Sequence, residues 1–262
     1  MKNFLTAVLL GAVAVSSAAI KTENVNYKQG DTELQGYLAY DDSSKDKRPG
    51  VMVVHEWWGL DDYPKHRAEQ LAQLGYVAFA ADVFGKDKVT TDPKQAGQWA
   101  GELKGNRKLL RDRAAAGLEQ LKKNPLVDTS KVAAIGYCFG GTTVLELARM
   151  GADVAGVVSF HGGLESAPGM DAKNVKAKLL ILNGADDKMS SPEAVAALDK
   201  ELKAANADFK QIAYPGAVHG FTNPKNGKGA MGGAVAYNEN ADKSSWKEMQ
   251  DFFTKIFGST TK

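Results

Sequence analysis

Five short apolar stretches constrain the fold of this 262-residue chain more than any other feature. Apolar and polar residues do not alternate along them, so each stretch suits a strand buried on both faces, as in a parallel sheet. Residues 209–216 resemble a further strand, and residues 23–42 resemble two short strands that turn at Gly30 and Asp31. The five apolar stretches cover residues 50–60, 76–84, 132–137, 154–160 and 177–184.

Segments with helical spacing lie between these strands. They cover residues 64–74, 93–123, a stretch from about Thr142, 192–204 and 244–257. Alternation of strands and helices along the chain predicts an α/β fold with a mostly parallel central sheet flanked by helices. No repeat or linker interrupts the pattern, so residues 20–262 are expected to form a single domain. The glycine-rich residues 223–235 are predicted to be a mobile surface loop.

The first 19 residues have the pattern of a secretory signal peptide. Lys2 gives a positive start, residues 4–15 are apolar, and the small residues Ser17 and Ala19 suit cleavage after Ala19. The alternatives are a buried first helix or an uncleaved anchor, but the stretch is short for a membrane span. The sequence therefore predicts a periplasmic or secreted protein that has no membrane association once residues 1–19 are removed.

Charge and motif content exclude several kinds of partner. The formal net charge is +2 and no basic stripe is present, so a nucleic-acid partner is not expected. His55 and Glu56 begin like the zinc motif His-Glu-x-x-His, but Gly59 stands where the second histidine would be. The sequence thus predicts no metal and no cofactor, and a small-molecule substrate. The sequence does not determine the oligomeric state, although a monomer is favoured.

The single cysteine lies in an unusual local pattern. Gly136-x-Cys138-x-Gly140 follows an apolar run and precedes a helical pattern. A nucleophile elbow needs this context, because the nucleophile sits on a strained strand-to-helix turn where neighbouring backbone passes closely. The helix that follows would stabilise a thiolate and a developing oxyanion. The alternative is a small buried cysteine in a glycine turn.

A nucleophile of this kind needs an acid and a histidine later in the chain. His219 lies in a loop after a predicted strand, whereas His161 precedes any suitable acid and is expected to be structural or at the pocket rim. In the pattern Gly-x-x-Asp, Asp187 is the match and Asp186 is its neighbour, so Asp187 is favoured. Either aspartate could instead be a turn residue or a helix cap.

Backbone N–H groups would complete such a site. Phe139 directly follows the cysteine, and Trp57 follows the first buried strand, so their N–H groups are the candidates for an oxyanion hole. Glu56 is a carboxylate at the end of an apolar strand, which is costly unless it is paired. It could accept the Cys138 S–H or form a structural ion pair, and the residues alone leave both open.

Several motifs together resemble the dienelactone hydrolases (carboxymethylenebutenolidases) of the α/β-hydrolase superfamily. They are HEWWGL, AADVFGK, GYCFGG, GADDKMS and GAVHGF, and the resemblance spans about residues 25–258. It implies ester or lactone hydrolysis through a Cys138–His219–Asp187 triad and a thioester acyl-enzyme. It also implies that Glu56 partners the resting thiol and swings away when substrate binds.

The chain departs from the family pattern at two positions. Dienelactone-cleaving members bind the substrate carboxylate with two arginines, and Lys86 and Asn223 stand at the matching places. Lysine cannot give the bidentate grip of arginine, and asparagine has no charge. Trp58 and Tyr137 are further expected substrate contacts. The alternatives are a broad carboxylesterase or acyl-transfer enzyme on the same scaffold and, in another class, a redox-sensing thiol protein.

Overall fold

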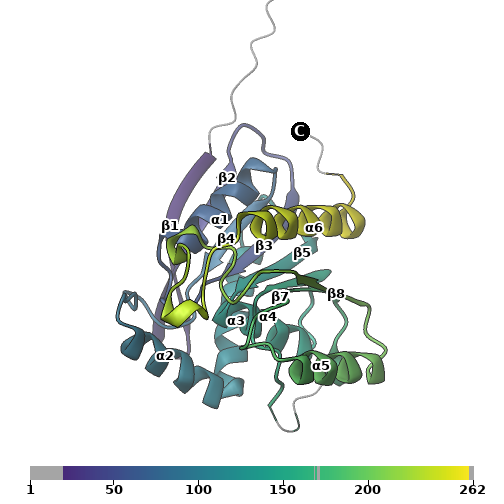
Figure 1. Cartoon of the computed structure of the whole chain (residues 1–262). Helices are drawn as coiled ribbons and strands as arrows, with labels where there is room; N and C mark the ends of the chain where they lie inside the picture. Colours follow the sequence, from purple (N-terminus) through teal and green to yellow (C-terminus); the bar gives the residue numbers. More distant parts are fainter. Residues whose placement is uncertain (1–19, 168, 170–171, 260–262) are drawn as a thin grey trace, which may run out of the picture.

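The computed structural model describes residues 20–167, 169 and 172–259. The predicted signal peptide, residues 1–19, lies outside them. The strands form one eight-stranded sheet with the order β1-β2-β4-β3-β5-β6-β7-β8 (Figure 1). Within the part of the chain that the structure describes, none of the helices has the length and apolarity needed to cross a membrane.

An antiparallel hairpin forms one edge of the sheet. It consists of β1 (Ile20–Gln29) and β2 (Thr32–Asp41), and Gly30 makes the turn at a φ of 55°. Glycine suits this turn, because residues with a side chain rarely adopt a positive φ. The hairpin predicted at Gly30 and Asp31 is confirmed, with strands longer than expected.

The other six strands are parallel to one another. All five residues of β4 and of β6 are buried, as the uninterrupted apolar runs predict. The carboxyl ends of these strands therefore meet at one edge, where open α/β sheets bind ligands. The six strands are β3 (Arg48–Val54), β4 (Val77–Ala81), β5 (Val127–Tyr137), β6 (Gly156–Phe160), β7 (Lys178–Gly184) and β8 (Phe209–Tyr214).

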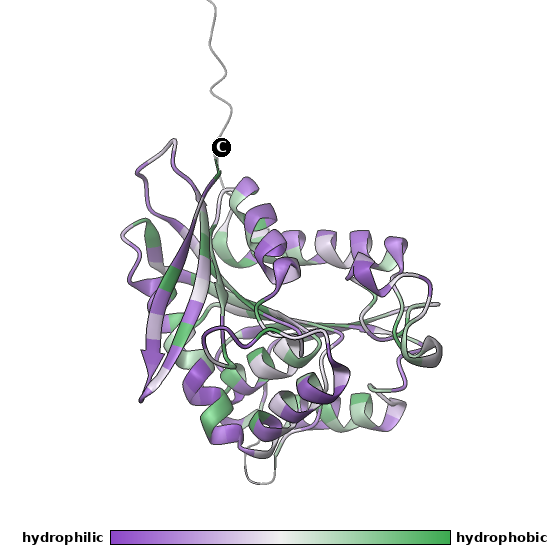
Figure 2. Ribbon diagram, turned by 90° about the vertical axis from the view of Figure 1, so that its left-hand side faces the viewer, coloured by the Kyte–Doolittle hydropathy of each residue, from purple (hydrophilic) through white to green (hydrophobic). Residues whose placement is uncertain are grey.

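Helices cover both faces of this sheet (Figures 1 and 2). Two of them, α1 (Asp62–Gln73) and α6 (Glu239–Phe257), pack their buried residues against one face. Most of the buried apolar residues of the other four belong to the core on the opposite face. These four are α2 (Pro93–Gly105), α3 (Arg107–Lys122), α4 (Phe139–Arg149) and α5 (Pro192–Ala204). The predicted α/β architecture is confirmed.

Helix α4 begins at Phe139, three residues before the predicted start at Thr142. The discrepancy has a physical cause. Gly140 and Gly141 occupy the first turn, and glycine disfavours helix by its backbone entropy. Tertiary contacts set the start of α4 instead, because both glycines pack closely against neighbouring backbone or side chains.

The segment after β8 contains two short 3₁₀ turns, Pro224–Asn226 and Met231–Gly233. Its far end returns to the chain before it. Val235 forms a β-bridge with His219, and the Ala236 N–H donates to the His219 carbonyl over 3.2 Å. The segment predicted to be a surface loop is therefore tied to the backbone of His219.

Candidate functional site

Cys138 stands at the sharp turn between β5 and α4. Its φ of 54° and ψ of −114° lie in a region that costs a non-glycine residue on the order of 1–3 kcal/mol. Two glycines make the turn possible. A Cβ on Gly136 would lie 2.1 Å from the Gly140 carbonyl oxygen, and one on Gly140 would lie 2.2 Å from the Val54 carbonyl oxygen. The elbow thus rests directly on the end of β3.

Three side chains from separate strand ends form a row at this turn. The His219 Nε2 atom lies 3.0 Å from the Cys138 Sγ atom, and its Nδ1 atom lies 3.0 Å from the Asp187 Oδ2 atom. Asp187 follows β7 and is buried, and its Oδ1 atom accepts the Met189 N–H. Asp186 is exposed. The structure therefore brings together Cys138, His219 and Asp187, and leaves Asp186 outside the row.

The electrostatics of the row favour a protonated imidazole. Burial alone would lower the pKa of His219, but the negative charge of Cys138 and the hydrogen bond to Asp187 raise it to about 10. A cationic ring between two acidic groups is the state that stabilises a thiolate. The row can therefore hold a Cys138 thiolate beside an imidazolium.

His161 holds the elbow from behind. Its Nδ1 atom accepts the Cys138 N–H over 3.1 Å, and its Nε2 atom lies 2.7 Å from the Thr222 hydroxyl. Complete burial and the nearby charge of His219 hold the pKa of His161 well below its usual value. A neutral ring with its proton on Nε2 fits both contacts, so the expected structural role of His161 agrees with its position.

Glu56 forms its hydrogen bond with Asn223 and not with the Cys138 thiol. Its side chain is buried, with 4% of the residue exposed, and its Oε2 atom accepts a 2.6 Å hydrogen bond from the Asn223 amide. Burial raises the pKa of Glu56 to about 7, although the Asn223 hydrogen bond opposes this rise. The implied pairing of Glu56 with the resting thiol differs from the structure, in which Cys138 pairs with His219. The loop after β8 brings the Asn223 amide to the end of β3, so the Glu56 carboxylate accepts a hydrogen bond from Asn223 instead of one from the thiol.

The candidate oxyanion donors stand on either side of the elbow. Phe139 is the first residue of α4, so its N–H has no acceptor within the helix. Trp57 follows β3, whose end contacts Gly140. Both residues line the same cavity as Cys138. Their placement is compatible with the expected pair of donors.

A cavity of about 600 Å³ opens at Cys138 and His219. Trp57 and Trp58 form one wall, with ring centroids 4.7 Å apart. The sequence interpretation missed most of the remaining wall, because those residues lie on α2 and on irregular loops without a motif. The missed residues are Pro93, Ala100, Lys104, Gly163, Glu165, Met189, Asn226, Ala230, Met231 and Val235.

Three expected substrate contacts are not among the residues that line this cavity. Lys86 lines a separate hollow beside β1 and β2, because its N–H is bound to the Glu33 carbonyl. Tyr137 is fully buried on the other face of the sheet, stacked on Phe160. Asn223 is buried and donates its amide to Glu56. These positions correct the expected roles of all three residues.

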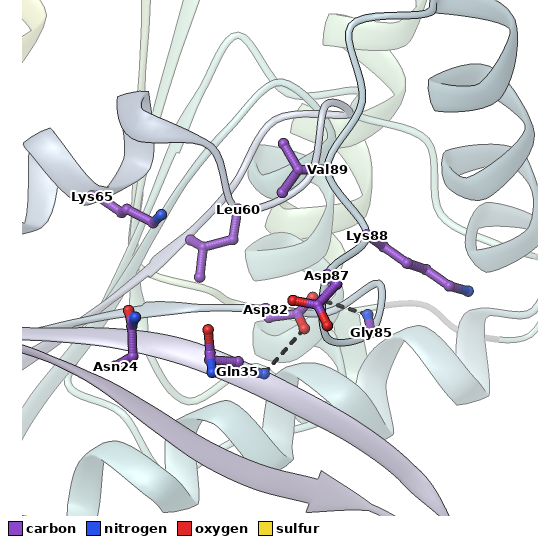
Figure 3. A pocket seen from close by; sticks show the side chains of 9 residues that line it. All are labelled: Asn24, Gln35, Leu60, Lys65, Asp82, Gly85, Asp87, Lys88 and Val89. Carbon is purple, nitrogen blue, oxygen red and sulfur yellow. Dashed lines mark hydrogen bonds between the residues drawn. The ribbon is translucent and has the colours of Figure 1, made fainter.

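Asp82 holds the loop after β4 in place through hydrogen bonds to the backbone of Gly85 and Gln35 (Figure 3). Its Oδ1 atom accepts the N–H groups of Phe84 and Gly85, and its Oδ2 atom accepts the Gln35 N–H. A small polar hollow of about 140 Å³ lies beside it. Further along the loop, the Thr90 N–H donates to the Trp58 carbonyl, so this loop also supports the tryptophan wall.

The imidazole of His55 is already engaged by backbone groups. Its Nδ1 atom lies 2.6 Å from the Glu56 carbonyl oxygen, and its Nε2 atom accepts the Val83 N–H. Across the described ranges, no cluster of three or more histidine, cysteine, aspartate or glutamate side chains could hold a metal ion.

Comparison with known proteins points to one family. The model of the dienelactone hydrolase family matches residues 34–257. Protein usf of Aquifex pyrophilus is 30% identical over 205 residues, which cover 77% of this chain and 87% of that protein.

Two solved structures are similar over nearly their whole length. One, named m3DLH, is 37% identical, with a TM-score of 0.87 and coverage of 91% of this chain and 99% of that one. The other is described as a dienelactone hydrolase-like promiscuous phosphotriesterase from metagenomic libraries. It is 39% identical, with a TM-score of 0.87 and coverage of 92% and 100%.

Proposed function

This chain belongs to the dienelactone hydrolase family and has the α/β-hydrolase fold, and from that premise we propose that it cleaves a carboxylic ester or lactone with Cys138 as nucleophile. The observation that carries the proposal is the row in which His219 lies 3.0 Å from both Cys138 and Asp187. Nucleophilic catalysis by cysteine needs such a base, oriented by a third group.

In the proposed first half-reaction, the Cys138 proton moves to His219 Nε2 and the thiolate attacks the ester carbonyl carbon. The carbonyl π electrons move to oxygen, where the N–H groups of Phe139 and Trp57 bind the oxyanion. Collapse of this intermediate breaks the bond to the alcohol oxygen, which takes the proton from His219. An acyl thioester on Cys138 remains.

The second half-reaction releases the acid. Water loses a proton to His219 and attacks the thioester carbonyl, and the C–S bond breaks to return the Cys138 thiolate. Asp187 keeps the His219 ring oriented and stabilises its cationic form through both steps. Asn223 keeps Glu56 engaged, so the thiol can pair with His219 before any substrate binds.

Phosphotriester hydrolysis is a second candidate. The observation that favours it is the 39% identity to the structure described as a promiscuous phosphotriesterase. The same thiolate could attack phosphorus and expel an aryloxide, with the oxygen of the P=O group in the position of the ester oxyanion.

The test is hydrolysis by purified protein of p-nitrophenyl acetate, a dienelactone and a p-nitrophenyl phosphotriester, before and after iodoacetamide. We expect ester hydrolysis to fall in step with one alkylation at Cys138, read by intact mass. Cys138→Ala should lower kcat by at least ~10³-fold while its urea unfolding stays cooperative. Full activity of a folded Cys138→Ala variant would refute the triad, and rapid alkylation without hydrolysis of any substrate would favour a sensor thiol.

A further inference from the structure

The cavity beside Cys138 is walled mainly by apolar side chains. Trp57 and Trp58 stand at the end of β3, and their rings are inclined at 56° to each other. Phe139 lines the cavity at the elbow, while Pro93 and Ala100 extend the wall along α2. A site of this volume and composition recognises a ligand mainly through apolar surface.

The rim of the cavity is apolar as well. Met189 is 45% exposed and Met231 is 56% exposed, and both line the cavity. Exposed apolar side chains that gather around a cavity often mark a ligand-binding site, and flexible methionine thioethers adapt to ligands of different shape. The rim therefore suits the entry of a bulky apolar group rather than a small polar one.

The charges on the cavity wall are mostly negative. Among the described lining residues, Glu56 and Glu165 carry carboxylates, Lys104 is the one lysine or arginine, and His219 adds its imidazole. Lys104 and Glu165 approach the same point: a Cβ built on Gly163 would lie 3.2 Å from the Glu165 Oε2 atom and 4.0 Å from the Lys104 Nζ atom. Glu165 thus offsets the positive charge of Lys104.

No arginine lies among the described residues that line the cavity. Lys86 lines a different hollow, and the Asn223 amide is donated to Glu56. The thiolate and imidazolium proposed for Cys138 and His219 cancel each other, and the Asp187 carboxylate lies directly behind them. A carboxylate on the acyl chain would therefore meet repulsion at this site.

We propose that the substrates of this site are uncharged esters with a bulky apolar acyl group, and that Glu165 disfavours acyl chains that end in a carboxylate. This inference rests on the proposed function. It makes Glu165 a specificity-determining residue for the charge of the substrate.

The experiment compares 4-nitrophenyl valerate with mono-4-nitrophenyl glutarate, which has the same acyl length but ends in a carboxylate. At pH 8 and low salt, we expect kcat/KM to favour valerate by at least ~10-fold, and added salt should narrow this difference. The kcat/KM for 4-nitrophenyl valerate should also exceed that for 4-nitrophenyl acetate by ~10-fold, because the longer acyl chain contacts more of the apolar wall.

Glu165→Lys tests the assigned residue. It should raise kcat/KM for the glutarate monoester relative to valerate by about 5–10-fold, because two lysines would then face the substrate carboxylate. Asp153→Lys is the matched control: it makes the same charge change at a fully exposed side chain beside the amino end of β6, away from the cavity. Its substrate ratio should equal that of the wild type.

Three outcomes would overturn the inference. The first is a wild-type kcat/KM for the glutarate monoester that equals or exceeds that for valerate. The second is a higher kcat/KM for acetate than for valerate. The third is a glutarate-to-valerate ratio of kcat/KM that is the same in Glu165→Lys as in Asp153→Lys. Hydrolysis of none of the three esters would instead refute the proposed function, and the inference with it.

Discussion

At the scale of single residues, burial of Glu56 lowers the free energy of unfolding by an amount that depends on pH. Its carboxyl group is buried, and its pKa rises from 4.5 to about 7 on folding. Between these values the folded protein holds a proton that the unfolded chain has released. The free energy of unfolding must therefore fall as pH rises from about 4.5 to about 7, and this contribution stays constant above that.

Glu56→Gln removes this titration and keeps an oxygen that can accept the Asn223 amide hydrogen. The free energy of unfolding of the variant minus that of the wild type should therefore increase from pH 4.5 to pH 8, by on the order of 3 kcal/mol. Urea unfolding of both proteins at the two pH values measures the difference. A stability difference that does not change with pH would show that Glu56 titrates as it does in the unfolded chain.

The residues of the row were predictable and the partner of Glu56 was not. Chain order and loop position single out Cys138, Asp187 and His219, because an elbow nucleophile is followed by its acid and then its histidine. The hydrogen bond between Glu56 and Asn223 joins residues 167 positions apart. It depends on the path of the loop after β8, which no local pattern encodes.

At the scale of elements, α4 can approach β3 closely because Gly140 has no side chain. Gly140→Ala would place a methyl group 2.2 Å from the Val54 carbonyl oxygen and 2.7 Å from that of His55. Backbone atoms cannot yield as a flexible side chain does, so we expect a loss of about 1–3 kcal/mol in the free energy of unfolding.

Gly101→Ala is the matched control, because nothing lies within 4 Å of the added methyl group on α2. That variant should gain roughly 0.5–1 kcal/mol from the lower entropy of the unfolded chain. Urea unfolding of both variants gives the comparison. Equal stability of Gly140→Ala and the wild type would contradict the close packing of the elbow.

Helices and strands differ in how well the sequence predicts their ends. The parallel strands follow from apolar runs, because full burial removes the need for polar residues. The start of α4 was misplaced because its first turn contains Gly140 and Gly141, which local propensity assigns to a turn. The Phe139 start depends on tertiary contacts, and the same contacts build the candidate site.

At the scale of the whole molecule, a largely buried ion pair joins α1 and α6. Arg67 of α1 donates to Asp242 of α6, and its guanidinium group stacks over Tyr63 and Trp246. It also donates to the Thr222 carbonyl, one residue before Asn223. This pair therefore connects the closing helix to the loop that positions Glu56.

Asp242→Asn should lower the free energy of unfolding by about 3 kcal/mol, because it leaves the buried Arg67 charge without its partner. Asp251→Asn, on the same helix, breaks only the exposed pair with Lys247 and should cost less than about 0.5 kcal/mol. Chemical unfolding of the two variants measures both losses. Equal losses would show that the buried pair has no greater weight than a surface pair.

The cavity wall was the least predictable part of the molecule. Alternation of strands and helices predicts the sheet, its helical layers and the edge where loops meet. Which loop side chains face Cys138 follows from the lengths and turns of several separate connections. Lys86 illustrates the limit: it matches a family position in sequence, but the Asp82 turn directs it to another hollow.

The row and part of the cavity wall come from different kinds of segment, and this separation has an evolutionary consequence. Cys138, Asp187 and His219 lie within five residues of the ends of β5, β7 and β8, whereas Lys104 and Glu165 lie on α2 and on the long connection between β6 and β7. Mutation can therefore alter the wall without disturbing the sheet that aligns the row. Descendants of one ancestral gene could in this way diverge toward new substrates while inheriting the same reaction.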